Sequence, residues 1–276
     1  MLPLYKIRMY QLTFILIFIL SYSTNVATAN SQKPMGKIVE YKEGNTLLEG
    51  YLAAIPSTSK KDRPGVLVVH EWTGLGDYAK GRADQLAQLG YIAFAADIYG
   101  KGIRPKSPKE AGETASIYKK DRKLMRARVL SALEVLKKQP GIDKNKIGAI
   151  GYCFGGTTVL ELARSGAPVQ GVVSFHGGLS TPTPQEAKQI RAKVLALHGA
   201  DDPYVTAEEV SFFEKEMREG GVDWQLVKYS KAVHSFTNPD AGNDNSQGAA
   251  YNASADHRSW IAMKSFFDEL FHSPAN

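Results

Sequence analysis

The stretch KIGAIGYCFGGTTVLELA, residues 146–163, contains the pattern that decides the fold. Its apolar first part is typical of a buried strand, its last part is typical of a helix, and Gly151-Tyr152-Cys153-Phe154-Gly155 joins the two. Strand, Gly-x-nucleophile-x-Gly and helix form a nucleophile elbow, a sharp turn that presents one reactive side chain above a sheet. Glycine at the two outer positions lets the strand and the helix approach closely. Cys153, the only cysteine, is therefore the predicted nucleophile, and the alternative is a buried structural cysteine.

Two downstream segments supply the acid and the base that a nucleophilic thiol needs. The buried strand expected before Ala200 leads into a loop with Asp201 and Asp202, and His234 follows the last expected strand. We predict Asp202 as the acid that orients His234, and His234 as the base that deprotonates the thiol. Asp201 is the rival acid, because a single sequence does not fix the register within an Asp-Asp pair. The order nucleophile, acid, histidine is the chain order of α/β-hydrolases.

The five other histidines are rivals for the role of base. His70, His176 and His198 each end an apolar run, so each could lie near the site or simply bond to backbone groups. His257 and His272 fall in or near the last expected helix, where a solvated surface histidine is the expected state. None of the five has the strand-end position after the acid that His234 has.

A second segment with chemistry is the apolar run of residues 65–69 and its exit loop. In a fold with a nucleophile elbow, the loop after this strand supplies one amide of the oxyanion hole, and the residue after the nucleophile supplies the other. The backbone N–H groups of Trp72 and Phe154 are therefore the predicted oxyanion hole. Glu71 is unexpected here, because a carboxylate beside a thiol opposes thiolate formation unless a cation or a hydrogen bond compensates. The alternative for Glu71 is a loop carboxylate paired with a nearby basic residue.

Beyond Ser31, strand and helix patterns alternate along the chain. This alternation predicts a single-domain α/β-hydrolase fold over residues 30–276, with a mostly parallel central sheet, helices on both faces and an N-terminal antiparallel hairpin. The loop at residues 239–254, rich in Asp, Asn and Gly, is expected to form one wall of the site near His234. Strands are expected at residues 37–41, 47–53, 64–69, 91–95, 146–150, 169–175, 193–197 and 224–229. Helices are expected at residues 78–89, twice within 108–137, after the elbow, and at 207–219 and 255–271.

These segments together resemble the dienelactone hydrolase family from about Gly36 onward. The matching pieces are HEWTGL at residues 70–75, ADIYG at 96–100, GYCFGG at 151–156, HGADDPYV at 198–205 and HSF at 234–236. The resemblance implies that Cys153, Asp202 and His234 form a catalytic triad, and that Glu71 helps to take the thiol proton when substrate binds. It implies cysteine-dependent cleavage of an ester or lactone through a thioester acyl-enzyme, as in a carboxymethylenebutenolidase-type reaction. No metal or organic cofactor is expected.

The sequence departs from the family at the expected substrate-binding cations. The prototype enzymes hold a substrate carboxylate with two arginines, whereas Lys101 and Arg104 are the candidates for the first cation here, and no cation follows His234 closely. The expected partner is therefore a small-molecule ester or lactone. The resemblance does not extend to a chlorinated aromatic dienelactone as the substrate. The alternative function is that of an exported ligand-binding protein that keeps the fold without turnover.

The start of the chain has the three-part layout of a secretory signal peptide. Lys6 and Arg8 precede the apolar residues 12–20, and Ala27-Thr28-Ala29 follows as a cleavage site. Residues 1–29 are therefore the predicted signal peptide, cleaved after Ala29, with export to a periplasm or outside the cell. The apolar run is short for a bilayer span, which favours a cleaved signal peptide over a retained anchor, and no stable membrane insertion is expected after cleavage. The alternative is a membrane tether formed by an uncleaved N-terminal segment.

Composition limits the remaining function classes. The chain has 276 residues, of which 43% are hydrophobic and 22% are charged, which is enough for a sizeable core in one domain. The net charge is +6 with lysines and arginines scattered along the chain, so no nucleic-acid partner is expected. A thiol redox protein would need a resolving cysteine, and the chain has one cysteine only. The oligomeric state is left open.

Overall fold

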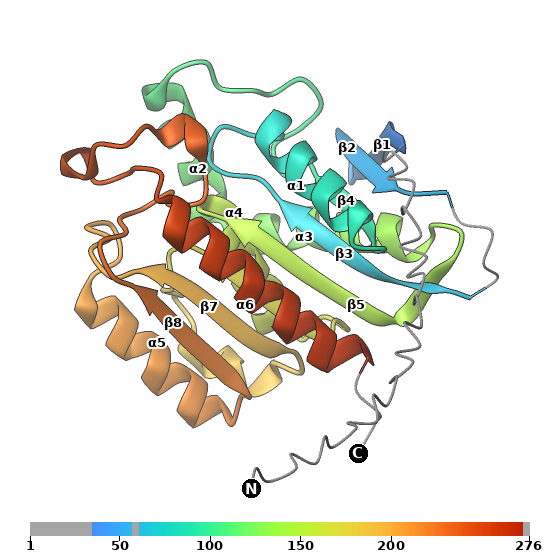
Figure 1. The fold of residues 1–276 in the computed structure, drawn as a ribbon. Coiled ribbons are helices and arrows are strands. Elements are labelled where there is room, and N and C mark those ends of the chain that lie inside the picture. Colours follow the sequence, from blue (N-terminus) through green and yellow to red (C-terminus); the bar gives the residue numbers. More distant parts are fainter. Residues whose placement is uncertain (1–34, 57–60, 273–276) are drawn as a thin grey trace, which may run out of the picture. The chain divides into compact units, whose positions relative to one another are not determined.

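The computed structural model describes residues 35–56 and 61–272, which form the α/β unit drawn in Figure 1. The predicted signal peptide and its cleavage site lie outside the described residues. Among the helices of the described residues, none has both the length and the apolar character that crossing a bilayer requires.

The centre of the described unit is an eight-stranded sheet with the strand order β1-β2-β4-β3-β5-β6-β7-β8. β1 and β2 form an antiparallel hairpin and β2 pairs antiparallel with β4, whereas all pairings from β4 to β8 are parallel. The strands are β1 (Met35–Glu43), β2 (Thr46–Ala54), β3 (Arg63–Val69), β4 (Ile92–Ala96), β5 (Ile142–Tyr152), β6 (Gly171–Phe175), β7 (Lys193–Gly199) and β8 (Trp224–Tyr229).

Helices cover both faces of this sheet (Figure 1). α1 (Asp77–Gln88) and α6 (Ala253–His272) pack on one face. α3 (Arg122–Lys137), α4 (Phe154–Arg164) and α5 (Ala207–Gly220) pack on the other, and α2 (Pro108–Lys120) lies against α3. The predicted fold class is confirmed by this arrangement. Three short 3-10 helices were not predicted: η1 (Pro184–Gln189), η2 (Pro239–Ala241) and η3 (Asn245–Gln247), of which the last two lie in the loop at residues 239–254.

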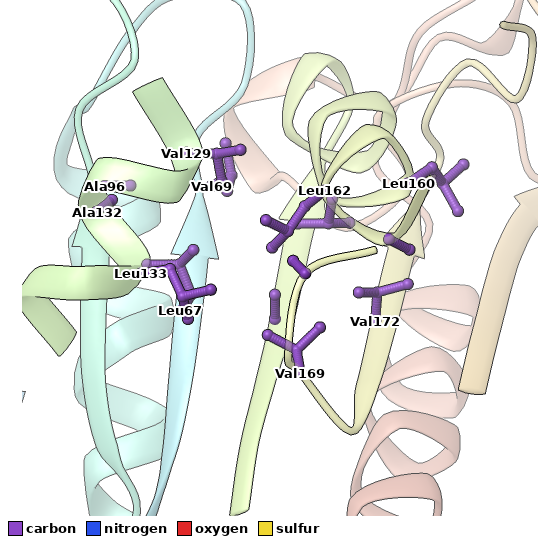
Figure 2. Close-up of a cluster of buried hydrophobic side chains, with 14 of the residues drawn as sticks. Leu67, Val69, Ala96, Val129, Ala132, Leu133, Leu160, Leu162, Val169 and Val172 are labelled. Carbon is purple, nitrogen blue, oxygen red and sulfur yellow. The ribbon is translucent and has the colours of Figure 1, made fainter. Parts of the chain in front are cut away.

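The core explains why β3 is apolar along most of its length. Leu67 and Val69 belong to the cluster on the side of α3 and α4, whereas Val66 and Val68 belong to the cluster on the side of α1 and α6. Figure 2 shows Leu67 and Val69 beside side chains of α3, among them Leu133. A strand covered on both faces has no solvent-facing positions, so its sequence does not alternate between apolar and polar residues.

β5 begins at Ile142, four residues before the predicted start at residue 146. Residues 143–145 are largely exposed and polar, so no apolar pattern marked this part of the strand. Ile142 nevertheless pairs with Arg63 of β3, beyond a register shift in the ladder. The elbow end of β5 was predicted more accurately, because there the burial is continuous.

The parallel strands set the position of the site. β3, β5, β7 and β8 all end at the same edge of the sheet, where the loops that follow them carry Glu71, Cys153, Asp202 and His234. In open α/β sheets, the crevice outside the carboxyl ends of the strands is the usual place for a ligand.

Candidate active site

Cys153 occupies a strained turn between β5 and α4. Its backbone has φ +54° and ψ −114°, a region that a residue with a side chain adopts only when the surrounding structure enforces it. Two hydrogen bonds provide that enforcement, because the Cys153 N–H donates to the carbonyl of Phe175 at 3.0 Å and to Nδ1 of His176 at 3.1 Å. The elbow geometry predicted from the sequence is therefore present.

The glycines on either side of Cys153 are required by close backbone contacts. A Cβ atom at Gly151 would lie 2.0 Å from the carbonyl oxygen of Gly155, and one at Gly155 would lie 2.2 Å from the carbonyl oxygen of Val69. Backbone atoms cannot move away as a flexible side chain can, so any other residue at either position would displace the turn.

The three predicted triad side chains form one hydrogen-bonded chain. His234 Nε2 lies 3.0 Å from Cys153 Sγ, and His234 Nδ1 lies 2.8 Å from Asp202 Oδ2. The other carboxylate oxygen of Asp202 accepts the backbone N–H of Tyr204 at 2.8 Å, which fixes the carboxylate plane. Asp202 is buried and Asp201 is exposed, so it is Asp202 that faces the imidazole. This geometry suits proton transfer from sulfur to nitrogen, and the catalytic roles themselves remain a prediction.

The surroundings of His234 favour its protonated form. Burial lowers the pKa of His234, but Cys153 and Asp202 on its two ring nitrogens outweigh burial and raise this pKa to about 10. An imidazolium beside a cysteine stabilises the thiolate, which is the nucleophilic form of the side chain. The site therefore favours a protonated His234 beside the sulfur of Cys153.

Replacing Cys153 with alanine is expected to lower the pKa of His234, because the sulfur is the largest of the influences that raise it. In the unmodified protein, the imidazole should stay protonated at pH 8, below its pKa of about 10. Nitrogen chemical shifts of the histidine rings, followed by NMR from pH 6 to 11 in both proteins, measure the two titrations. An identical titration of His234 in both proteins would contradict the influence of the sulfur on the pKa of His234.

Glu71 joins the loop after β3 to the loop that carries His234. Its buried carboxylate accepts a hydrogen bond from Nδ2 of Asn238 at 2.5 Å and a second from the side chain of Ser235. Burial raises the pKa of Glu71, and the bonds from Asn238 and Ser235 and the charge of His234 oppose this rise. The carboxylate beside the thiol needs a cation or a hydrogen bond to compensate for it, and Asn238 supplies such a hydrogen bond. Within the described chain, the Glu71 carboxylate makes no hydrogen bond to Cys153.

The predicted oxyanion hole lies beside the nucleophile. Trp72 and Phe154 line the same cavity as Cys153. Neither backbone N–H donates to an acceptor within residues 35–56 or 61–272, so both are available to a substrate oxygen. Their role is still a prediction, and the geometry is compatible with it.

A cavity of about 320 Å³ opens next to the sulfur of Cys153. Its walls include Tyr204, Val205 and Thr157, and Lys119 at the end of α2 adds a cationic side chain besides His234. This volume suits a small ester or lactone. From the loop at residues 239–254, Ala249 lines the cavity. The expectation that this loop forms one wall of the site is therefore met in part.

Lys101 and Arg104, the predicted substrate-binding cations, do not line this cavity. Lys101 instead forms an exposed ion pair with Glu40, and the guanidinium of Arg104 donates to the carbonyl of Leu75 at 2.5 Å. Partners from elsewhere in the sequence occupy both side chains, and their role in substrate binding stays a prediction. Lys119 was missed, since a lysine near the end of a helix carries no sequence signal for a site.

None of the rival histidines has a ring nitrogen bonded to the sulfur of Cys153 among the described residues. His70 Nε2 accepts the N–H of Ile98 at 3.2 Å, and its Nδ1 lies 2.6 Å from the carbonyl oxygen of Glu71. His198 is buried near Asp202, its Nδ1 has no hydrogen-bond partner among the described residues, and burial lowers its pKa. His257 and His272 are exposed on α6. His176 contacts the backbone of Cys153, as described above.

Comparison with known proteins identifies a matching family model and several similar proteins. The model of the "Dienelactone hydrolase family" matches residues 48–271. A relative from Aquifex aeolicus, which bears the provisional name carboxymethylenebutenolidase, is 32% identical over 74% of this chain and 88% of its own length. The solved structure named m3DLH is 41% identical with a TM-score of 0.83, covering 87% of this chain and 99% of its own. The dienelactone hydrolase-like promiscuous phosphotriesterase P91 from metagenomic libraries is 42% identical with a TM-score of 0.81, covering 86% and 99%.

Proposed function

The chain belongs to the dienelactone hydrolase family, and we propose that it hydrolyses esters or lactones with Cys153 as nucleophile, through a thioester acyl-enzyme. One observation carries this proposal more than any other. The sulfur lies 3.0 Å from His234 Nε2 and at the same time borders an open cavity, so it has both a base and access to substrate. A buried structural cysteine would have neither.

In the proposed mechanism, His234 holds the proton of the Cys153 thiol, with Asp202 fixing the ring. The thiolate attacks the carbonyl carbon, and the oxyanion that forms accepts hydrogen bonds from the amides of Trp72 and Phe154. Each such donor contributes about 3 kcal/mol in comparable sites. The tetrahedral species collapses to a thioester, and His234 returns the proton to the departing alkoxide.

Water completes the cycle. His234, neutral again, takes a proton from a water molecule that attacks the thioester, and the thiolate leaves to restore the starting pair. With a lactone substrate, the alkoxide stays attached to the acyl group, so the product is a single hydroxy acid. Glu71, whose carboxylate is held by Asn238, can assist in taking the thiol proton in any molecule where His234 does not already hold it. No step requires a metal or an organic cofactor.

An acyl group is expected to accumulate on Cys153 when the purified protein is mixed with activated aryl esters and quenched in acid within seconds. Intact-mass spectrometry should show the chain plus one acyl group minus one hydrogen, and digestion should place the adduct on the peptide with Cys153. The panel should contain neutral esters, neutral lactones and lactones with a carboxylate, since Lys119 can attract an anion. An aryl phosphotriester belongs in it because of the name of P91.

Turnover of panel members without any adduct on Cys153, even at the earliest quench, would argue for direct attack by water and against the thioester. Hydrolysis of no member of a broad panel would argue against the proposed function itself. The binding-protein alternative gains no support from the names of these relatives, which refer to hydrolytic enzymes.

A further inference from the structure

His176 is a buried histidine that the proposed mechanism does not use. It follows β6 directly, is only 1% exposed and has a φ of +41°, a left-handed value that is uncommon for a residue with a side chain. Its ring lies between two aromatic neighbours, with centroids 5.3 Å from that of His234 and 5.1 Å from that of Phe236. A histidine that only fills space needs neither a strained backbone nor a place between these rings.

The hydrogen bonds of His176 define its tautomer. Nδ1 accepts the backbone N–H of Cys153 at 3.1 Å, so this nitrogen carries no proton. The proton is then on Nε2, which lies 2.7 Å from Oγ1 of Thr237 and donates to it. Burial, followed by the nearby charges of His234 and Arg82, keeps the pKa of His176 well below its ordinary value, so the ring stays neutral beside the protonated His234.

Thr237 is itself held firmly from α1. It is fully buried, its hydroxyl lies 2.7 Å from the hydroxyl of Tyr78, and its carbonyl accepts a hydrogen bond of 2.8 Å from the guanidinium of Arg82. Arg82 is anchored in turn by Asp256 of α6 at 2.6 Å. Thr237 lies three residues beyond His234, so these bonds fix the loop that carries the base.

The two ends of the His176 ring therefore reach the two parts of the molecule that carry the reactive pair. One nitrogen bonds to the strained backbone of the nucleophile, and the other bonds to the loop of the base. We propose that His176 is a positioning residue, which sets the separation between Cys153 Sγ and His234 Nε2 by tying the elbow to the loop through Thr237. The predicted effect of His176 on turnover rests on the proposed function. The predicted effect on the reactivity of the thiol is independent of that function.

The physical argument concerns small displacements. A sulfur and a nitrogen at 3.0 Å share a proton efficiently, whereas a displacement near 1 Å in a catalytic pair costs on the order of 10²-fold in rate. The elbow and the loop belong to different segments, 81 residues apart in the chain, and the ring of His176 bonds to both of them without lining the cavity. Without the ring, the strained Cys153 amide would lose one of its two acceptors.

The test uses the fact that the chain has one cysteine, so iodoacetamide reports on Cys153 without any substrate. In His176→Phe, which keeps an aromatic ring but has no nitrogen, the alkylation rate at pH 7 should fall about tenfold, since less thiolate is present. Thr237→Val, which removes only the hydroxyl, should slow alkylation about threefold, and Thr237→Ser should restore the wild-type rate. kcat on an aryl ester should fall in parallel, with KM nearly unchanged.

Tyr41→Phe is the matched control for loss of a buried bridging side chain. Its hydroxyl bonds twice to the backbone of Asp97 and to no atom of Cys153 or His234, so the variant should lower the unfolding midpoint and leave the alkylation rate unchanged. Folded His176→Phe with wild-type alkylation and wild-type kcat would overturn the proposal. If that variant does not fold, wild-type values for Thr237→Val would overturn it equally. Loss of thiol reactivity in a protein that hydrolyses no ester would support His176 as a positioning residue while rejecting the proposed function.

Discussion

Replacing Cys153 with alanine is expected to lower kcat for ester or lactone hydrolysis by at least about 10⁴-fold, because the group that forms the covalent intermediate is removed. The residual rate comes from substrate binding and from the amides of Trp72 and Phe154. Without the nucleophile, these contributions still give a rate above that of the reaction in water. KM should change little, since the cavity walls remain. Initial rates on the best aryl ester of the panel, measured over a range of substrate concentrations, give both constants.

Cys153→Ser is the companion variant, because it keeps a nucleophilic atom of a different kind. A hydroxyl is a far weaker nucleophile than a thiolate unless its base is well matched to it, so kcat should lie between the wild-type and alanine values. Unfolding by urea should show both variants folded, as Cys153 is small and only half-buried. A kcat for the alanine variant close to that of the wild type would reject Cys153 as the nucleophile. Equal inertness of both proteins with retained ligand binding would favour the binding-protein alternative.

The elbow could be predicted from the sequence because its constraints are local. Gly151 and Gly155 flank Cys153 within five residues, and the contact that requires glycine at position 151 is with Gly155 of the same turn, whereas the contact at Gly155 is with Val69 of β3. The proximity of Asp202 and His234 could be predicted for a different reason. Both follow parallel strands of one sheet, and parallel strands end at one edge, so their loops meet.

The contacts that the sequence did not predict join segments without any periodic pattern. Asn238 bonds to Glu71 across 167 residues, and Thr237 bonds to His176 across 61 residues. Such pairs depend on how two loops lie against each other, which neither hydrophobic pattern nor turn residues specify. The same reason explains why the sequence did not predict the partners of Lys101 and Arg104. Their loop was located correctly, but the acceptors that engage them, Glu40 and the carbonyl of Leu75, come from other parts of the chain.

The adjacent carboxylates Asp201 and Asp202 offer a sharp test of the orienting acid. Asp202→Asn is expected to lower kcat about 10³-fold. The amide N–H₂ that replaces Oδ2 would donate to His234 Nδ1, which places the ring proton on Nε2, facing the sulfur. A ring in that tautomer cannot accept the thiol proton. The remaining amide oxygen can still accept the N–H of Tyr204, so the loop should keep its structure.

Asp201→Asn is the control, since it makes the same chemical change one residue away on an exposed side chain. Its kcat should stay within about twofold of the wild-type value, as is usual for surface changes without a buried partner. The profile of kcat/KM against pH separates the two roles further. Asp202 raises the pKa of His234, so Asp202→Asn should move the limb that reports His234 to lower pH, whereas Asp201→Asn should leave it in place. A larger loss of activity in Asp201→Asn than in Asp202→Asn would reassign the orienting acid, and with it the register of the loop after β7.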